Sequence, residues 1–431
     1  MKILIISHNA LSTYQNMGKS MLALFSRFKS EEVCQLYIYP SIPDVNKCSS
    51  YYRITDKDVL HNWLRCVRGK EVSWSSDAHS LFEDSKDEEV YRDKKNKSPF
   101  RMLLRDFLWK TSRWLSKDLL NWIKKEAPTS IFVAPGQAKF LYDMALTISR
   151  KFHLSIVTYI CDDYYFLKPS DCLWGGLQHK LLTGKIEQLM SKSCHLVAIS
   201  EEIGDAFAGK FQKPAKVIMT GSSYPIATEV KVKQNPTHIT YIGNIRRNRF
   251  YSLVDVGKVI DEINAERNTD YKLNIYTFEN DKEILNNFKE IKSICLCGSV
   301  TGVEFDRVFH SSELLLHVEA FDANSIDLVK RSVSTKIADS LGSGIPLIAY
   351  GPGEVSSMLH LKRNQCALIA ENKADLKKAL IDAFDNLELK YEIAKNELLT
   401  ARKYHDSQIT GEEFYNLMWG INENPSSKFC L

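Results

Sequence analysis

The chain has 431 residues, of which 57 are Lys or Arg and 53 are Asp or Glu, so its formal net charge is +4. This length is too great for one ordinary hydrophobic core and predicts two domains. A hydrophobic fraction of 44% and a charged fraction of 26% are typical of a soluble globular protein, and the near balance of charge gives no support for nucleic-acid binding.

The first half of the chain alternates short apolar runs with segments of helical spacing. Strands are predicted where apolar residues run without a helical period, and helices where they recur every three or four residues. The predicted strands are Lys2–Ser7, Leu36–Tyr39, Ile131–Ala134, Ser155–Cys161, His195–Ile199 and Val217–Met219, and the predicted helices are Lys19–Phe28, Phe100–Ala127, Gly184–Ser193 and Glu201–Phe211. From about 44 to 98 the pattern breaks down, and Glu83–Lys97 is predicted as a solvated loop or an exposed helix.

The polar stretch Thr228–Thr237 lacks a period and contains Pro236, so it is predicted to be a linker before a second α/β series. The predicted strands of that series are His238–Ile242, Lys272–Tyr276, Ile294–Cys297, Leu314–Val318 and Ile345–Tyr350, and its helices are Asp255–Asn264, Glu304–His310, a short helix from Ser334, Glu354–Leu361, Ala374–Asn386 and most of Tyr391–Trp419. Alternating strands and helices predict an α/β fold with right-handed crossovers. We expect domains over 1–227, with an irregular insertion near 44–98, and over 228–400, followed by a helical segment over 401–431 that packs back on the first.

The ten cysteines are scattered, and only Cys295 and Cys297 lie close together. On alternate positions of a strand their side chains would point to opposite faces, which disfavours a shared metal ion. The opening run MKILIIS leads directly to His8 and Asn9, so it is shorter than the apolar region of a secretory signal, and no later apolar run approaches the ~20 residues that cross a bilayer. We therefore expect reduced thiols, no metal and a cytoplasmic location.

The stretch from Leu314 to Pro352 carries the clearest ligand-binding pattern. Ser334, Thr335 and Lys336 open a short helix whose N-terminal backbone N–H groups, hydroxyls and ammonium can all face an anion. Asp339 follows one turn later on roughly the same face. An anion cradle with a carboxylate one turn away suits a nucleoside diphosphate, because the carboxylate can accept from the ribose hydroxyls.

With this stretch, with YIGNIRRNRF from Tyr241 and with LVAISEEIGDAF from Leu196, the chain resembles the GT-B glycosyltransferases of the retaining, family 4-like group that makes bacterial polysaccharides and glycolipids. The resemblance covers most of the chain outside roughly 44–97. It implies two Rossmann-like domains facing across a cleft. It also implies a UDP- or GDP-sugar donor held mainly by the second domain, with no cofactor or metal required.

The resemblance implies roles for a basic loop. Gly243 matches the glycine after the first strand of the donor domain, Asn244 stands where an Arg is usual, and Arg249 stands where a Lys is usual and would hold the diphosphate. Arg246 and Arg247 lie near enough in sequence to replace the missing charge. A solvated basic loop is the alternative interpretation.

The acidic residues depart further from the resemblance. Relatives often carry two glutamates separated by seven residues, the second touching ribose; Asp339 matches the second, whereas Arg331 occupies the first position. Glu319 is the nearest acidic substitute for contacts to the donor sugar, and Lys336 would stabilise the departing diphosphate. The alternatives are a strand-end salt bridge for Glu319 and an ordinary helix start for Ser334 and its neighbours.

Two features of the first domain would face the cleft. Gly18 matches the loop glycine whose backbone approaches the donor phosphates. The run MGKS also suggests an ATPase phosphate loop, but Thr13 stands where a Walker motif needs a glycine. Asp162 and Asp163 follow a strand, where a carboxylate can accept the acceptor's proton or orient the donor sugar. Capping of the next segment is the alternative.

The segment from Phe100 to Lys125 alternates apolar residues with Arg and Lys. One interpretation is an amphipathic surface at the inner face of the membrane, with Trp109, Trp114 and Trp122 meeting the bilayer near a lipid-linked acceptor. The other is an ordinary packed helix.

We therefore expect a retaining glycosyltransferase that moves a sugar from a nucleoside diphosphate to a glycan or lipid-linked glycan, in bacterial surface polysaccharide synthesis. Two other interpretations stay open. One is a sugar-nucleotide epimerase or a phosphorylase of the same fold, although no cofactor lysine of a phosphorylase is identified. The other is an inactive GT-B partner of an active transferase, which the departures at Asn244 and Arg331 favour.

Overall fold

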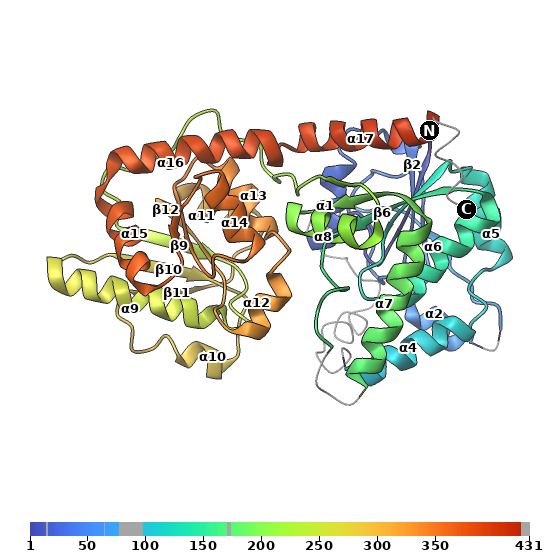
Figure 1. Cartoon of the computed structure of the whole chain (residues 1–431), viewed down its shortest axis with the longest axis horizontal. Helices are drawn as coiled ribbons and strands as arrows, with labels where there is room; N and C mark the ends of the chain where they lie inside the picture. Colours follow the sequence, from blue (N-terminus) through green and yellow to red (C-terminus); the bar gives the residue numbers. More distant parts are fainter. Residues whose placement is uncertain (14–15, 64, 77–97, 170–173, 424–431) are drawn as a thin grey trace. The chain divides into compact units, whose positions relative to one another are not determined.

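A computed structural model describes residues 1–13, 16–63, 65–76, 98–169 and 174–423 (Figure 1). The stretch predicted as a solvated loop or exposed helix, 83–97, lies outside these residues. Internal contacts divide the chain into two compact units. Unit 1 comprises Met1–Met219 and Thr410–Leu431, and unit 2 comprises Thr220–Ile409.

Unit 1 is built on an eight-stranded sheet with the order β4-β3-β2-β1-β5-β6-β7-β8. Its strands are β1 (Ile3–Ser7), β2 (Val33–Tyr37), β3 (Tyr51–Arg53), β4 (Lys70–Val72), β5 (Ser130–Ala134), β6 (Ser155–Ile160), β7 (Ser193–Ala198) and β8 (Ala215–Val217). All neighbouring strands are parallel except β3 and β4. Ile3 of β1 pairs with Val33 on one side and Ser130 on the other, so the strand order reverses beside β1. Ligands of open α/β sheets bind outside the carboxyl ends of the strands at such a reversal.

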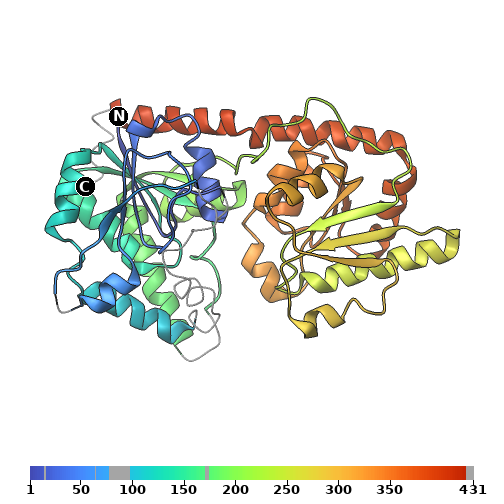
Figure 2. The same cartoon turned by 180° about the vertical axis from the view of Figure 1, so that it is seen from behind.

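The helices of unit 1 cover both faces of this sheet (Figure 2). They are α1 (Asn16–Leu24), α2 (Asp56–His61), α4 (Pro99–Thr111), α5 (Lys117–Glu126), α6 (Lys139–Phe152), α7 (Gly175–Lys192), α8 (Glu201–Phe211) and α17 (Ser407–Glu423), with a short 3₁₀ turn η1 (Ser30–Glu32). On one face Phe25, after α1, packs edge-on against Phe414 of α17, with ring centres 5.1 Å apart. On the other face Trp109 of α4 stacks on Phe140 of α6 at 4.2 Å.

Unit 2 is built on a six-stranded parallel sheet with the order β11-β10-β9-β12-β13-β14. Its elements are β9 (His238–Ile242), α9 (Arg249–Arg267), β10 (Lys272–Tyr276), α10 (Lys282–Asn286), β11 (Ile294–Gly298), α11 (Gly302–Ser311), β12 (Leu314–Val318), α12 (Ala323–Val329), α13 (Thr335–Gly342), β13 (Leu347–Tyr350), α14 (Ser356–Arg363), β14 (Leu368–Ala370), α15 (Lys373–Asp385), α16 (Leu387–Thr400) and a π-helical turn η4 (Ala401–His405). Helices α9 and α15 cover one face, and α11, α13 and α14 cover the other. The strand order reverses between β9 and β12, so the ends of these strands are where a ligand is expected.

The strands follow the predicted runs closely, whereas several helices differ. The helix predicted over Phe100–Ala127 is two helices, because the Ser116 hydroxyl accepts from Leu119 N and starts α5 separately from α4. Helix α1 begins before Lys19 and ends at Leu24. The helix predicted from Gly184 is only the second half of α7. The elements that were not predicted at all are α2, α6, α10, α12, β3, β4 and β14.

Candidate functional site

The N-terminus of α13 lies at the carboxyl edge of the unit 2 sheet. Its N-cap residue, Ser334, makes no side-chain capping hydrogen bond. The N–H of Ser334 donates to Ser357 Oγ at 3.0 Å, which fixes the approach to the helix. The N–H groups of Thr335 and Lys336 precede the first intrahelical hydrogen bond. The helix therefore presents a hydroxyl and the positive end of its dipole where an anion can bind.

Lys336 points across the end of β9. Its ammonium donates to the Ile242 carbonyl at 3.3 Å and lies 5.1 Å from the centre of the Tyr241 ring. A Cβ on Gly243 would collide with Lys336 Nζ, so the glycine leaves room for the ammonium. Desolvation by the surrounding protein, and next the Arg249 cation, lower the pKa of Lys336, although the residue keeps exposed surface and water screens part of the effect. Among the described residues no carboxylate lies within ion-pair distance of this ammonium.

Arg249, the first residue of α9, is held by Glu319 beyond the end of β12. The guanidinium donates to Glu319 Oε2 from Nε at 3.0 Å and from Nη2 at 2.8 Å. His317 Nε2 lies 3.3 Å from Oε1 of the same carboxylate. The exposed fraction of the side chain is 18% for Arg249 and 3% for Glu319. Glu319 is therefore a buried anchor for Arg249, and this geometry favours the salt-bridge alternative over direct contact with a donor sugar.

These contacts shift the pKa of Glu319. Burial alone would raise it, but the hydrogen bonds and charges of His317 and Arg249 outweigh burial and lower the pKa to about 2. The carboxylate is therefore ionised at neutral pH, and it keeps Arg249 oriented.

The loop between β9 and α9 carries the remaining basic side chains. Arg246 is neutralised by Glu279, with Nη2 2.8 Å from Oε1. Arg247 adopts a left-handed backbone conformation with φ 55°, and its carbonyl accepts from Ser325 Oγ at 3.1 Å. The Arg247 side chain is exposed, and no carboxylate of the described residues forms an ion pair with it. Asn244, also exposed, accepts from Arg246 N at 2.8 Å and shapes the loop.

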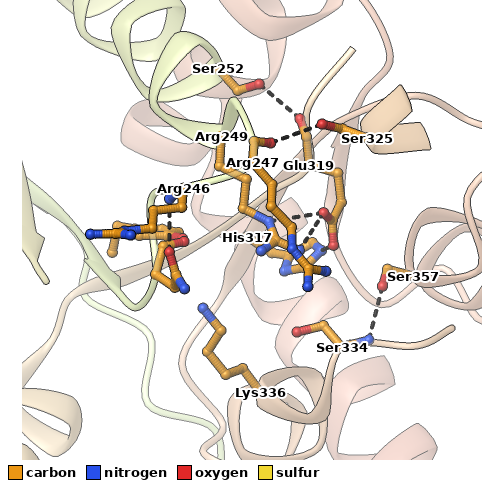
Figure 3. Close-up of polar contacts among 12 residues, drawn as sticks. Arg246, Arg247, Arg249, Ser252, His317, Glu319, Ser325, Ser334, Lys336 and Ser357 are labelled. Atoms are coloured by element: carbon orange, nitrogen blue, oxygen red, sulfur yellow. Dashed lines mark hydrogen bonds and ion pairs between the residues drawn. The ribbon is translucent and has the colours of Figure 1, made fainter. Parts of the chain in front are cut away.

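The structure brings most of the predicted donor-side residues together. Figure 3 shows the side chains of Arg247, Ser334 and Lys336 directed toward the space beside the Arg249–Glu319 pair. Glu319 and Glu279 neutralise Arg249 and Arg246. Two further cations, on Arg247 and Lys336, thus remain beside the N-terminus of α13, and such an arrangement suits an anion of more than one charge.

Asp339 is more constrained than the sequence predicted. Its Oδ1 accepts from Ser223 N at 2.7 Å and from Ser222 Oγ at 3.3 Å, and its Oδ2 accepts from Ser223 Oγ at 3.4 Å. The carboxylate thus ties α13 to the segment that opens unit 2. Contact with ribose stays a prediction and would have to share these oxygens.

The two aspartates after β6 in unit 1 have different surroundings. Asp163 is buried, with an exposed fraction of 3%, and its Oδ1 accepts from Phe166 N at 2.9 Å, which is the capping arrangement. Asp162 is exposed, and its Oδ2 accepts from the Tyr164 hydroxyl at 2.9 Å. Of the two, Asp162 is therefore the one that can meet a substrate.

A small cavity opens beside Asp162 at the carboxyl ends of β5 and β6. Its volume is about 20 Å³, which is room for about one water molecule. Tyr142, Tyr159, Cys161 and Tyr164 contribute to its wall. A cavity of this size cannot hold a sugar ring, so any acceptor would lie outside it.

Gly18 lies in the first turn of α1 rather than in the preceding loop. A Cβ there would approach the Ala10 carbonyl oxygen to 2.5 Å and Ser12 Cβ to 3.0 Å. The absence of a side chain therefore lets α1 pack on the loop after β1. Approach to donor phosphates stays a prediction for this residue.

The tryptophans of the predicted amphipathic segment do not form an exposed surface. Trp109 and Trp122 have exposed fractions of 1% and 2% and belong to the core, and Trp114 is partly buried. The interpretation that Trp109 and Trp122 meet a bilayer is wrong, because both rings are buried, which favours the packed-helix alternative for them. Membrane contact by the rest of the segment stays a prediction. The exposed apolar residues of α4 lie elsewhere on that helix.

Three supporting residues were missed from the sequence: His317, Glu279 and Ser357. His317 stands two residues before Glu319 on an extended chain, so a shared face could have been inferred from the strand period. Ser357 and Glu279 come from distant elements, and nothing near them in the sequence marks their partners.

Within the described residues, no group of three or more His, Cys, Asp or Glu side chains is placed to hold a metal ion. In the same part of the chain, no helix has both the length and the apolar run that crossing a membrane requires.

No protein-family model matches the sequence, and no curated protein sequence is detectably similar to it. The architecture, with two Rossmann-like units each built on a parallel-dominated sheet, is the GT-B fold of solved glycosyltransferases, which confirms the predicted fold class.

Two solved structures illustrate the likeness. HepE of Anabaena, solved in complex with UDP, is 10% identical with a TM-score of 0.60, and the match covers 97% of this chain and 100% of HepE. The α,α-trehalose-phosphate synthase (UDP-forming) of Burkholderia vietnamiensis is 11% identical with a TM-score of 0.58, and the match covers 97% of this chain and 100% of the synthase. At this identity the comparison establishes the fold.

Proposed function

We propose that this protein is a retaining glycosyltransferase that uses a nucleoside-diphosphate sugar as donor. The observation that carries the proposal is the pair of cations at the N-terminus of α13. Lys336 and Arg247 have no carboxylate partner among the described residues. The Ser334 hydroxyl makes no capping hydrogen bond to the helix. A diphosphate supplies the negative charge that this arrangement lacks. The fold, shared with HepE solved with UDP and with UDP-glucose, supports a UDP-sugar donor over a GDP-sugar.

In this mechanism the charge that develops on the leaving diphosphate is stabilised by Lys336, by the α13 N-terminus and by Arg249, which Glu319 holds in place. Fixed cations of this kind accelerate group transfer because they require no reorganisation when the charge develops. Gly243 gives Lys336 the room to reach this position. Glu319 acts as a positioning residue, whereas Lys336 and Arg249 touch the donor.

The acceptor is a glycan or a lipid-linked glycan in bacterial surface polysaccharide synthesis, at the cytoplasmic face of the membrane. Asp162 is the acceptor-side carboxylate, because it is exposed at the carboxyl end of β6 while Asp163 is buried in a cap. Asp162 accepts the proton of the attacking hydroxyl or orients the donor sugar.

The test is a thermal-shift screen against sugar nucleotides, followed by product analysis. A UDP-sugar at a hundredfold excess over its Kd should stabilise the protein by about 2.7 kcal/mol, because the ligand binds only the folded state. Lys336→Ala should lose this stabilisation, whereas Lys362→Ala, an exposed lysine of α14, should keep it. If no sugar nucleotide stabilises the wild type, the proposal fails. A free, altered sugar nucleotide as the product would indicate epimerisation instead of transfer.

A further inference from the structure

One surface of unit 1 exposes large apolar side chains on two neighbouring helices. On α4 they recur at positions 100, 104 and 107, and at the start of α7 they recur at positions 174, 177 and 181, so each set lies on one helix face. We call these six residues the α4/α7 patch: Phe100, Leu104, Phe107, Trp174, Leu177 and Leu181. Their exposed fractions lie between 45% and 57%.

The two helix faces form one patch. The rings of Phe100 and Trp174 lie 6.3 Å apart, so they join the start of α4 to the start of α7. Six half-exposed large side chains amount to several hundred Å² of apolar surface, which soluble monomers rarely leave contiguous and uncovered. We therefore expect this apolar surface to be covered by a binding partner or a membrane.

The basic residues around the patch favour an anionic membrane surface as its binding partner. Arg101, Lys110 and Lys180 are exposed on the same two helices. The acid within α4, Asp106, does not offset them, because it turns inward to Lys139 with Oδ2 2.5 Å from Nζ. Apolar side chains framed by cations match a bilayer surface with anionic headgroups, where rings and aliphatic chains insert and ammonium groups meet phosphates.

The patch also lies at the carboxyl edge of the unit 1 sheet. Arg105 of α4 donates to Asp56 Oδ1 at 2.9 Å and lies 3.3 Å from His8 Nε2. His8 directly follows β1, and Asp56 starts the helix that follows β3, so α4 runs across this edge. Helix α7 begins after the loop that leaves β6 and carries Asp162. The exposed patch and the exposed aspartate thus share one edge of the sheet.

We propose that the α4/α7 patch docks this protein on an anionic membrane surface. The proposal deepens the proposed function and rests on it in one respect, since a lipid-linked acceptor supplies the reason for membrane contact. In this proposal the residues that contact the membrane are the exposed residues of the α4/α7 patch, and not Trp109 and Trp122, which are buried.

The test is flotation of the full chain with vesicles of phosphatidylglycerol and phosphatidylcholine, against vesicles of phosphatidylcholine alone. The wild type should bind the anionic vesicles more tightly, and added salt should weaken binding. Leu104→Gln/Leu177→Gln should lower the vesicle affinity by about tenfold or more, because the apolar contact is lost. The matched control is Leu399→Gln, which replaces a leucine with an exposed fraction of 53% on α16 and should bind as the wild type does.

The charge contribution has its own variants. Lys110→Gln/Lys180→Gln should lower affinity for anionic vesicles by about tenfold or more and leave binding to neutral vesicles unchanged. Lys289→Gln/Lys395→Gln removes two exposed lysines of unit 2 and should have no effect.

Three outcomes would overturn the proposal: a wild type that binds no vesicles, patch variants that bind like the wild type, or a wild-type dimer that the patch variants dissociate. The last result, from light scattering on the same proteins, would show that a second copy covers the patch. Stabilisation by the donor, measured on every variant, separates this test from the proposed function. Patch variants that keep donor binding but lose vesicle binding support the docking surface, and a wild type that binds vesicles but no donor refutes only the transferase.

Discussion

The carboxyl edges of the two sheets use their charged residues in different ways. In unit 2 the acids anchor arginines, Glu319 for Arg249 and Glu279 for Arg246, and Lys336 stands at a helix N-terminus with no carboxylate of the described chain beside it. In unit 1, Asp163 caps a backbone turn and Asp162 accepts from a tyrosine hydroxyl. The unit 2 edge is therefore preorganised for an anion, whereas at the unit 1 edge Arg105 is paired with Asp56 and Asp162 is an exposed carboxylate. This contrast matches a charged donor and an uncharged acceptor hydroxyl.

The largest effect is expected from Lys336→Ala. Removal of one charge contact to the leaving group costs about 3 kcal/mol of transition-state stabilisation, so turnover should fall about a hundredfold or more. Lys362→Ala is the control and should keep the wild-type rate. Rates should be measured by nucleotide release under saturating donor. A near-normal rate for Lys336→Ala with an intact fold would contradict the claim that the unit 2 edge stabilises the leaving diphosphate and so differs from the unit 1 edge.

The next effect is expected from Glu319→Gln, as a loss of stability. The variant leaves Arg249 without its buried counter-charge and should lower the free energy of unfolding by about 2 kcal/mol at neutral pH. The folded pKa of about 2 lies below the ordinary 4.5, so the contribution is complete above about pH 4.5 and is lost as the pH falls through 2. The gap between the wild type and Glu319→Gln should therefore close on acidification.

Urea unfolding from pH 2.5 to 7 measures this gap. The matched control is Glu304→Gln, which removes a half-exposed surface partner of Arg307 and should leave stability unchanged at every pH. A gap that stays constant with pH would mean that the carboxylate does not anchor Arg249 as a charge.

A smaller effect separates the two aspartates of unit 1. Asp163→Ala should lower stability by about 1 kcal/mol, because a buried hydrogen bond to Phe166 N is lost. Asp162→Ala should change stability by less than about 0.5 kcal/mol, because the side chain is exposed. Equal stability losses, measured by thermal unfolding of both variants, would contradict the assignment of Asp162 as the substrate-facing acid.

The smallest effect is expected from Asp339→Asn. An amide oxygen can still accept from Ser223 N, so donor affinity should fall by less than about threefold if the side chain mainly ties α13 to that segment. Calorimetric titration with the donor measures this directly. A loss of tenfold or more would show that the carboxylate binds ribose as the sequence predicted.

Local patterns in the sequence predicted most strands and the start of α13, because both depend on residues close together in the chain. Apolar runs located most strands but missed β3, β4 and β14, and Ser334 to Lys336 showed where α13 begins. The ends of the helices were predicted less accurately than the strands. For example, the N-cap at Ser116 separates α4 from α5 within a continuous amphipathic pattern. Helix α6 was overlooked although its apolar residues recur with a helical period.

Contacts between distant segments could not be predicted in the same way. Asp339 meets Ser223, which lies 116 residues earlier, and the anchor of Arg249 lies 70 residues later. Glu319 was selected for its position at a strand end, but only the fold shows that both of its oxygens are engaged. The sequence left open whether the tryptophans between Phe100 and Lys125 face a membrane or the core, because amphipathic spacing does not show which helix face packs on the sheet.

The most direct test of the central claim is a crystal structure of the protein with UDP bound. The account predicts that the diphosphate lies at the N-terminus of α13, within hydrogen-bond distance of the Ser334 hydroxyl and the Lys336 ammonium, with Arg249 still paired to Glu319. A diphosphate bound away from α13, or one that leaves Lys336 on the Ile242 carbonyl, would contradict it.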